Sequence, residues 1–206
     1  MRHFTLRPAA RDILTFWFGT PLQQDWPDTD RHALWFGGGA DLDRDIRERF
    51  APLVEQAAHG GLADWEPPIG ERLALVLLLD QFSRNVHRGT AAAFAGDARA
   101  QQLVRQSVAQ DAYTQLPTVG QVFLFMPFMH AEDLALQDTC VTLFQDLIAR
   151  SPPELQMKLA GNLSAARQHR DIVARFGRFP HRNAALGRQD SPDEVLFLHS
   201  GPRFGQ

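Results

Sequence analysis

Apolar residues recur at helical spacing along most of the chain. Within residues 42–57 they follow one another at intervals of four, four, three, one and three, which is typical of an amphipathic helix with one buried face. Residues 73–79 are apolar without interruption, so the helix that contains them is expected at the centre of the fold. No convincing segment alternates with the period of two that a half-buried strand requires. The pattern predicts an all-α protein.

The same periodicity, together with the Gly, Pro and capping residues that start and end helices, predicts where the helices lie. The expected ranges are 8–18, 41–59, 70–85, 97–110, 118–125, 131–149, 152–176 and 191–198. Pro127 is expected to interrupt the fifth of them. Ser151 and Ser191 each precede a glutamate by three residues, which is the spacing of a capping box. We expect stacked antiparallel helix pairs.

Length and composition narrow the class of protein. At 206 residues and 44% hydrophobic content, the chain is expected to form a single helical domain over residues 1–206. A net charge of −3 argues against a nucleic-acid or membrane-surface binder. The single cysteine, Cys140, excludes an internal disulfide and a thiolate zinc cluster. With no visible signal peptide and no spanning segment, we expect a cytoplasmic protein; the oligomeric state stays open.

The charge is unevenly distributed. Residues 167–188 contain six arginines and one acid, Asp171. Within this region, the segment 175–188 is expected to be a stiff loop, since Gly177 can end the preceding helix and Pro180 restricts Phe179. Arginine presents a planar fork of donors suited to carboxylate or phosphate. The segment is therefore a candidate anion site.

Polar residues also interrupt the apolar stripes of three predicted helices. His130 and Gln137 lie on one stripe, and Asn162 and His169 on another. The central helix ends with Asp80 and Arg84 four residues apart, and Arg88 follows. Because buried polar groups must be hydrogen-bonded, we expect these residues to converge. Two interpretations remain: a network that pins the arginine loop to the bundle, or a pocket in which spare arginine donors meet an anion.

The sequence gives less support for a metal site or for a nucleophilic enzyme. The histidines and acids lack the strict spacing of a metal site, so we expect no metal and no cofactor. Ser83, Ser107 and Ser164 are ordinary helix serines without a nucleophile elbow, and Cys140 lies among apolar neighbours. A hydrolase would use His130 or His169 as general base, oriented by Asp80 or Asp133. A scaffold that binds a partner helix in a groove is the third class.

Several motifs together resemble one bacterial family. They are Ile13-Leu-x-Phe-Trp-Phe-Gly19, Trp35-Phe36, Leu77-Leu-Leu-Asp-Gln-Phe-Ser-Arg-Asn-Val-His-Arg-Gly89, Met126-Pro-Phe-Met-His-Ala-Glu-Asp-Leu-Ala-Leu-Gln137 and Arg175-Phe-Gly-Arg-Phe-Pro-His-Arg-Asn183 with Gly187-Arg188. The chain is similar over nearly its whole length to the family called domain of unknown function 924. The resemblance implies an α-α superhelix like that of tetratricopeptide-repeat proteins, and it implies no activity.

The chain departs from the family pattern at four positions. Ser83, His87, Met129 and Ala131 stand where the family usually has Pro, Phe, Glu and Ser. The loss of an acid and a hydroxyl beside His130 weakens a catalytic role for that histidine. The arginine loop is intact.

We therefore predict a helical protein whose semi-buried Arg/His/Asp site binds a small anion or an acidic peptide terminus. The expected ligand-binding residues are Arg84, Arg88, Gln137, Arg175, Arg178, His181, Arg182, Asn183 and Arg188. The catalytic candidates of the alternative enzyme are His130, His169, Asp80 and Asp133.

Overall fold

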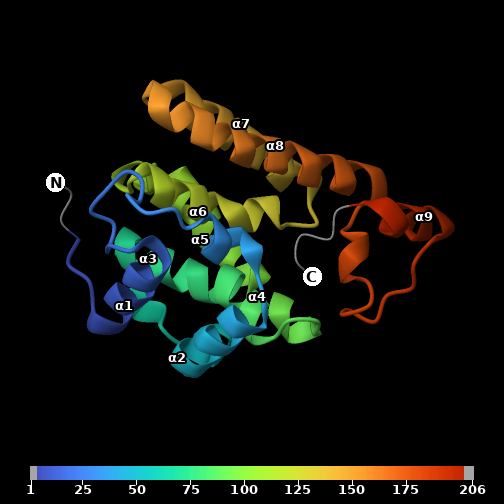
Figure 1. Ribbon diagram of the computed structural model, residues 1–206, viewed down its shortest axis with the longest axis horizontal. Coiled ribbons are helices and arrows are strands. Elements are labelled where there is room, and N and C mark those ends of the chain that lie inside the picture. The colour runs from blue at the N-terminus through green and yellow to red at the C-terminus, as the bar shows by residue number, and fades with distance from the viewer. Residues whose placement is uncertain (1–3, 202–206) are drawn as a thin grey trace.

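The computed structural model describes residues 4–201, and helices make up its regular structure (Figure 1). Their bounds are α1 Pro8–Phe18, α2 Ala40–Ala58, α3 Ile69–Val76, α4 Ser83–Val86, α5 Asp97–Ala109, α6 Thr118–Met129, α7 Leu134–Arg150, α8 Pro153–Phe176 and α9 Pro192–Ser200. No strand occurs in this part of the chain. The all-α prediction is confirmed.

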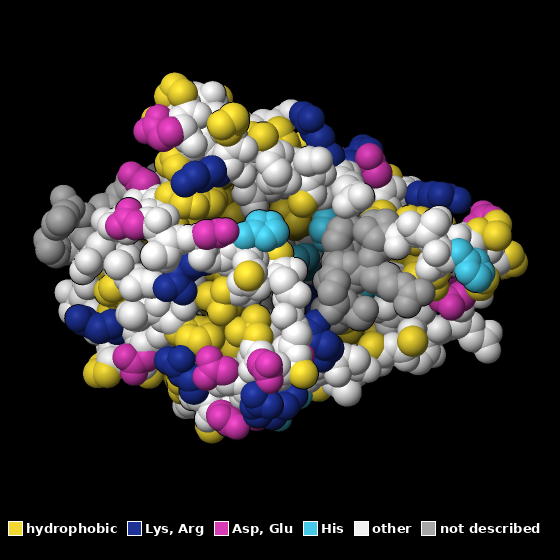
Figure 2. All heavy atoms as spheres, in the orientation of Figure 1, with side chains coloured by type: hydrophobic (Ala, Val, Ile, Leu, Met, Phe, Trp, Pro, Cys, Tyr) yellow, Lys and Arg dark blue, Asp and Glu magenta, His cyan; other side chains and the backbone are white. Residues whose placement is uncertain are grey.

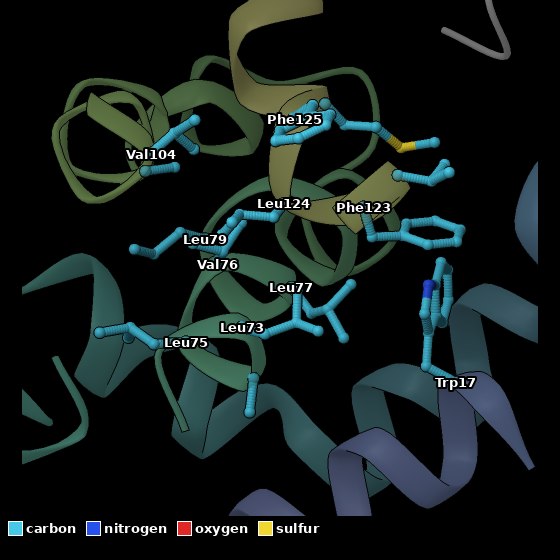
Figure 3. Close-up of a cluster of buried hydrophobic side chains, with 14 of the residues drawn as sticks. Trp17, Leu73, Leu75, Val76, Leu77, Leu79, Val104, Phe123, Leu124 and Phe125 are labelled. Atoms are coloured by element: carbon cyan, nitrogen blue, oxygen red, sulfur yellow. The ribbon is translucent and has the colours of Figure 1, made fainter. Parts of the chain in front are cut away.

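The centre of the fold is one continuous helical rod. It consists of α3, a π-helical turn over Leu77–Phe82, and α4. From Ile69 to Val86 only Gln81 is more than marginally exposed. Figure 3 shows leucine and valine side chains of this rod among Trp17, Val104 and the three residues Phe123–Phe125. The expectation that the uniformly apolar helix lies at the centre is confirmed.

Other helices cover the rod on opposite sides (Figure 1). α7 and α8 form an antiparallel hairpin that turns at Ser151–Pro152, and α6 lies beneath it with every residue buried. α1 and α2 pack on the opposite side of the rod. Neighbouring helices therefore shield the rod and α6 from solvent, which explains why their sequences are largely apolar on all sides.

Three predictions about helix ends were wrong. The helix predicted from residue 131 begins at Leu134, because Asp133 caps it. α6 continues through Pro127 to Met129, because burial of every α6 residue holds the helix together past the one hydrogen bond that proline cannot donate. Ser151 does not cap α8: its hydroxyl donates to the Leu147 carbonyl oxygen at 2.6 Å, and Pro152 occupies the N-cap position. The capping box of Ser191 and Glu194 at the start of α9 is confirmed.

The C-terminal part of the chain has a small core of its own. Ile172, Val173 and Phe179 form it, with Phe176 and Phe197 packed against them. This cluster is separate from the main core that joins α1 to α8. The segment after α8 therefore depends on polar contacts as well as on apolar burial for its position.

No helix between residues 4 and 201 combines the length and apolar character needed to cross a bilayer. The cytoplasmic location, the single-domain boundary 1–206 and the likeness to tetratricopeptide repeats remain predictions; residues 1–3 and 202–206 lie outside the described part.

Candidate functional site

A cavity of about 540 Å³ opens between α8, the central rod and the segment 32–42. One face of α8, from Lys158 through Gly161, Asn162 and Ala165 to His169, forms one wall. The eleven residue steps from Lys158 to His169 correspond to about 16 Å along the helix. Histidine side chains gather in the middle of the face shown in Figure 2, where the surface is hollowed. The cavity is therefore elongated, with His169 near one end and Lys158 near the other.

The wall of the cavity is cationic and apolar. Its charged or titratable side chains are Arg84, Arg88, Lys158, Arg182, His32, His130, His169 and His181. Its large apolar side chains are Trp17, Leu34, Trp35, Phe36, Leu42, Phe94, Met126 and Met129. Among the described residues that line it there is no aspartate or glutamate. Such a surface presents hydrogen-bond donors and apolar area together.

Asp80 and His130 form a hydrogen-bonded pair at the polar end. Asp80 lies in the π-helical turn of the rod and is 1% exposed, and His130 follows the last residue of α6. The Nδ1 atom of His130 lies 2.8 and 3.0 Å from the two carboxylate oxygens of Asp80. The Gln81 amide donates to the same carboxylate at 2.5 Å. π-Helical turns often occur at functional sites, because the extra residue redirects side chains.

The carboxyl group of Asp80 is ionised. Burial by itself would raise its pKa, but the adjacent His130 and Arg84 more than offset that effect and hold the pKa well below its usual range. An ionised carboxylate only accepts hydrogen bonds, so Nδ1 of His130 is the donor. The lone pair of a neutral His130 ring is then on Nε2.

Arg84 and Arg182 meet on a shared acid, Asp97. The Arg84 guanidinium lies 2.8 Å from Asp97 and 3.3 Å from Asp80, and Arg182 lies 3.1 Å from the other oxygen of Asp97. Arg182 also donates to the carbonyl oxygen of His130 at 2.9 Å. Both guanidinium groups stack on Phe94, at 4.8 and 4.6 Å from the ring centroid. The network joins the rod, α5, the end of α6 and the C-terminal segment.

The positive charge of Arg182 is disfavoured by its surroundings. Burial and the nearby Arg84 lower its pKa to about 10. Its Nε atom is buried, and no described residue accepts a hydrogen bond from it. A buried donor without an acceptor is uncommon in folded proteins.

His169 and His181 stand beside this network as neutral rings. Nδ1 of His169 donates to the Ala165 carbonyl oxygen at 2.8 Å, and the His130 and His169 rings are 5.9 Å apart. Burial, reinforced by neighbouring positive groups, lowers the pKa of each to about 3. Phe179 packs against both rings, at centroid distances of 5.6 and 5.4 Å.

The structure brings together only some of the predicted site residues. Asp80, Arg84, His130, His169, His181 and Arg182 lie in or directly behind one wall of the cavity. Arg88 reaches the cavity elsewhere and forms a two-pronged ion pair with Asp43, with contacts of 2.7 and 2.8 Å. These residues come from segments far apart in the sequence.

Three predicted ligand-binding residues instead clamp the C-terminal segment. Arg188 binds Glu132 through two contacts of 2.6 and 2.8 Å and also donates to Asn183 at 2.9 Å. Glu132 accepts a further hydrogen bond from the backbone of Phe179, at 2.8 Å. Arg178 is held by Glu194 through two contacts of 2.7 Å. Arg178, Asn183 and Arg188 therefore belong to a network that holds the C-terminal segment in place.

The remaining predicted residues also lie outside the cavity wall. Gln137 is buried, and its amide donates to the carbonyl oxygens of Met129 and Ala131 at the end of α6. Asp133 caps α7 by accepting from the backbone of Ala135 and Leu136. Arg175 stacks on Phe176, at 4.6 Å. Each has a structural contact in place of a ligand-facing one.

Some residues in or behind the cavity wall were not predicted from the sequence. Asp97, the acid shared by two arginines behind the wall, is predicted from the sequence only as the start of a helix. Gly161 is not among the predicted site residues, although a glycine in the middle of an amphipathic helix is a local signal of required space. A Cβ atom added at Gly161 would meet nothing within 4 Å. Lys158, the one lysine of the chain, also lines the wall.

No set of three or more His, Cys, Asp or Glu side chains within residues 4–201 is arranged to hold a metal ion. The hydroxyls of Ser83 and Ser107 donate to the carbonyl oxygens four residues earlier, as expected for helix serines.

Comparison with known proteins gives a family and no activity. A family model described as a bacterial protein of unknown function (DUF924) matches residues 13–202. A solved structure of a protein of unknown function from Agrobacterium tumefaciens is similar, with a TM-score of 0.76 and 36% identity. The alignment covers 93% of this chain and 97% of that one. No curated protein matches.

Proposed function

The chain belongs to the DUF924 family of bacterial proteins of unknown function, and we propose that its cavity binds a small molecule with an anionic group and an apolar body. One observation carries this proposal: the described lining combines arginine, lysine and histidine side chains with large apolar ones and includes no acid. The carboxylates that balance Arg84, Arg88 and Arg182 lie behind the wall. The inner surface therefore presents donors to a ligand.

The anionic group is best placed at the end formed by Arg84, Arg182 and the histidines. Arg182 supports this position, since its Nε atom is buried without an acceptor and its charge is only partly balanced. A carboxylate or phosphate oxygen there would gain a charge-assisted hydrogen bond. The salt dependence of such binding should be modest, because buried charges are screened less than exposed ones.

The apolar body is best placed along the rest of the cavity. Trp35 and Phe36 come from the π-helical turn Ala33–Gly37, and Met126 and Met129 from the end of α6. Methionine side chains adapt to irregular apolar shapes. A second cavity of about 430 Å³ shares Trp35, Phe36 and Lys158 with the first, so an elongated ligand has room to continue.

A free organic acid and the C-terminal carboxylate of a peptide share this chemistry. The enclosed position of Arg182, which is 6% exposed, favours the smaller ligand because a peptide must also place its backbone. The scaffold alternative has less support, since the large apolar side chains exposed in the described part are scattered: Phe36, Leu134, Met157, Val195 and Leu196.

The test is a binding assay with matched acids and neutral analogues. Thermal unfolding would be followed with straight-chain carboxylates from butanoate to dodecanoate, their primary amides, and short peptides with free or amidated C-termini. At 100 times its dissociation constant a ligand stabilises by about 2.7 kcal/mol, which for a domain of this size corresponds to about 5–11 °C. We expect this shift with a free acid and not with its amide.

Variants locate the binding. Gly161→Leu should abolish the shift by filling the cavity without strain on the helix, whereas Gly161→Ala should largely keep it. Arg182→Gln should weaken it, and Arg170→Gln, which removes an exposed guanidinium paired with Asp138, should not. Equal binding of acid and amide, no shift with any acid, or a shift that persists in Gly161→Leu would contradict the proposal.

A further inference from the structure

We infer that the cavity is also a reaction site, in which His130 acts as a general base on water and Asp80 positions it, so that an ester carrying a carboxylate is hydrolysed. This inference rests on the proposed binding function. It goes beyond that function because binding alone requires neither a fixed histidine nor a buried acid behind it.

The geometry that carries the inference is that of His130. Both oxygens of Asp80 lie within 3.0 Å of Nδ1, which fixes the ring and its tautomer. No hydrogen bond in the described part of the chain uses Nε2 of this residue, and the side chain is 21% exposed at the cavity. A base needs such an atom: held in place, carrying a lone pair and reachable by a reactant.

The support behind Asp80 is more extensive than a structural pair needs. Gln81 donates to one carboxylate oxygen and Arg84 to the other. Asp80 itself is 1% exposed, and it keeps its negative charge. A buried carboxylate that orients an imidazole also stabilises the imidazolium that forms when the ring takes up a proton. Asp80 is thus a positioning residue, since it contacts the base and not the reactant.

The residues of the wall identify the nucleophile as water. Among the described residues that line the cavity there is no serine, threonine, cysteine or tyrosine. Cys140 is buried elsewhere, and burial holds the pKa of its thiol far above the ordinary value. The described part of the wall therefore offers no oxygen or sulfur atom for a covalent intermediate. The base acts on a water molecule beside the bound ester.

The proton and electron changes in the step balance. Nε2 of His130 takes a proton from water while the water oxygen bonds to the ester carbonyl carbon. The bond from that carbon to the leaving oxygen then breaks, and the proton on Nε2 passes to the leaving oxygen. Nothing is oxidised or reduced. Arg182 donates to the backbone carbonyl oxygen of His130 at 2.9 Å, so the end of the cavity that holds the ester's carboxylate lies next to the base.

The experiment uses half esters as probes. These are the mono-p-nitrophenyl esters of straight-chain dicarboxylic acids, matched with p-nitrophenyl esters of monocarboxylic acids of equal length. Release of nitrophenolate should be faster for the half esters. His130→Gln and Asp80→Asn should each lower kcat by about 10²-fold or more, the range of general base catalysis. Added imidazole should restore part of the rate to His130→Ala.

Matched controls separate chemistry from folding. His59→Gln and Asp138→Asn replace an exposed histidine and an exposed acid outside the cavity and should leave the rate unchanged. The dissociation constant of the corresponding dicarboxylate, measured on each variant, should stay within about threefold. A merely structural Asp80 would alter binding and rate together, whereas a positioning residue lowers kcat alone.

The outcomes are distinguishable. Dicarboxylate binding without any hydrolysis above that of His130→Gln would overturn this inference and leave the proposed binding function intact. Failure of every dicarboxylate and of every monocarboxylate to bind would overturn both. Hydrolysis that survives in His130→Gln, or a His130→Ala variant that imidazole does not rescue, would remove His130 from the chemistry.

Discussion

Two histidines in the cavity wall are neutral rings: His169 is buried and His181 is half-buried. His169 faces His130, His181 and Arg182. His181 faces Arg182, His130 and Arg84, and Glu132 opposes their effect on its pKa. Protonating either ring in the folded protein would place a further positive charge next to arginine. In the unfolded chain both rings would titrate near the ordinary value of about 6.5.

This difference predicts how stability varies with pH. A histidine whose pKa is lowered from about 6.5 to about 3 stabilises the fold fully above the higher value, and this stability is lost as the pH falls. As the pH falls from about 7.5 to about 5, protonation of each histidine in the unfolded chain should lower the free energy of unfolding by about 2 kcal/mol. His181→Gln should flatten the dependence measured by urea denaturation, and His59→Gln should not. An unchanged slope in His181→Gln would contradict the predicted burial of a neutral ring.

Helix α8 contains a glycine where its own stability would favour another residue. Gly161 is in the helix interior, where glycine is less favourable than alanine by about 0.5–1 kcal/mol. No neighbour explains it, because an added Cβ would meet nothing within 4 Å. Gly96, in contrast, lies against the rod, and its Cβ would come within 2.6 Å of the Leu79 carbonyl oxygen.

The two glycines therefore predict opposite results. Gly161→Ala should raise the melting temperature by about 1–4 °C, because it removes the helix penalty without a clash. Gly96→Ala should lower it, since the backbone of the rod must move. Calorimetry of both variants checks the pair. A destabilising Gly161→Ala would mean that the wall of the cavity is packed and has no room for a ligand.

Asp97 connects several distant elements of the fold. This acid of α5 binds Arg84 of the rod and Arg182 of the C-terminal segment, and Arg182 reaches the end of α6. Among the described residues, the buried members of the small apolar cluster under that segment are Ile172, Val173 and Phe179. The polar network must therefore supply much of the contact between the C-terminal segment and the rest of the molecule.

A double-mutant cycle tests this connection. Removing one partner of a buried ion pair leaves the other charge without compensation, so Asp97→Asn and Arg182→Gln should each cost about 3–5 kcal/mol. The double variant should cost less than the sum by about 0.5–3 kcal/mol. Urea denaturation of the four proteins gives the coupling energy. Additive losses would mean that the two side chains act independently, contrary to the 3.1 Å contact.

The sequence by itself determined the helices and the helix at the centre. Periodicity and capping residues are local, so they placed α1, the central rod and the capping box of Ser191 correctly. They failed at Pro127, where packing from all sides outweighs the one hydrogen bond that proline removes. The DUF924 motifs named the family, and the match over residues 13–202 confirms it.

Tertiary structure alone decided which polar residues share a site. Asp80 and His130 are fifty positions apart, and Arg182 is eighty-five from Asp97, so no spacing along the chain encodes either contact. The arginines of segment 175–188 looked alike in sequence. In the folded protein Arg178 binds Glu194 and Arg188 binds Glu132, whereas Arg182 lines the cavity. Each arginine's role depends on which acid lies within reach, and only the packing of distant helices sets that distance.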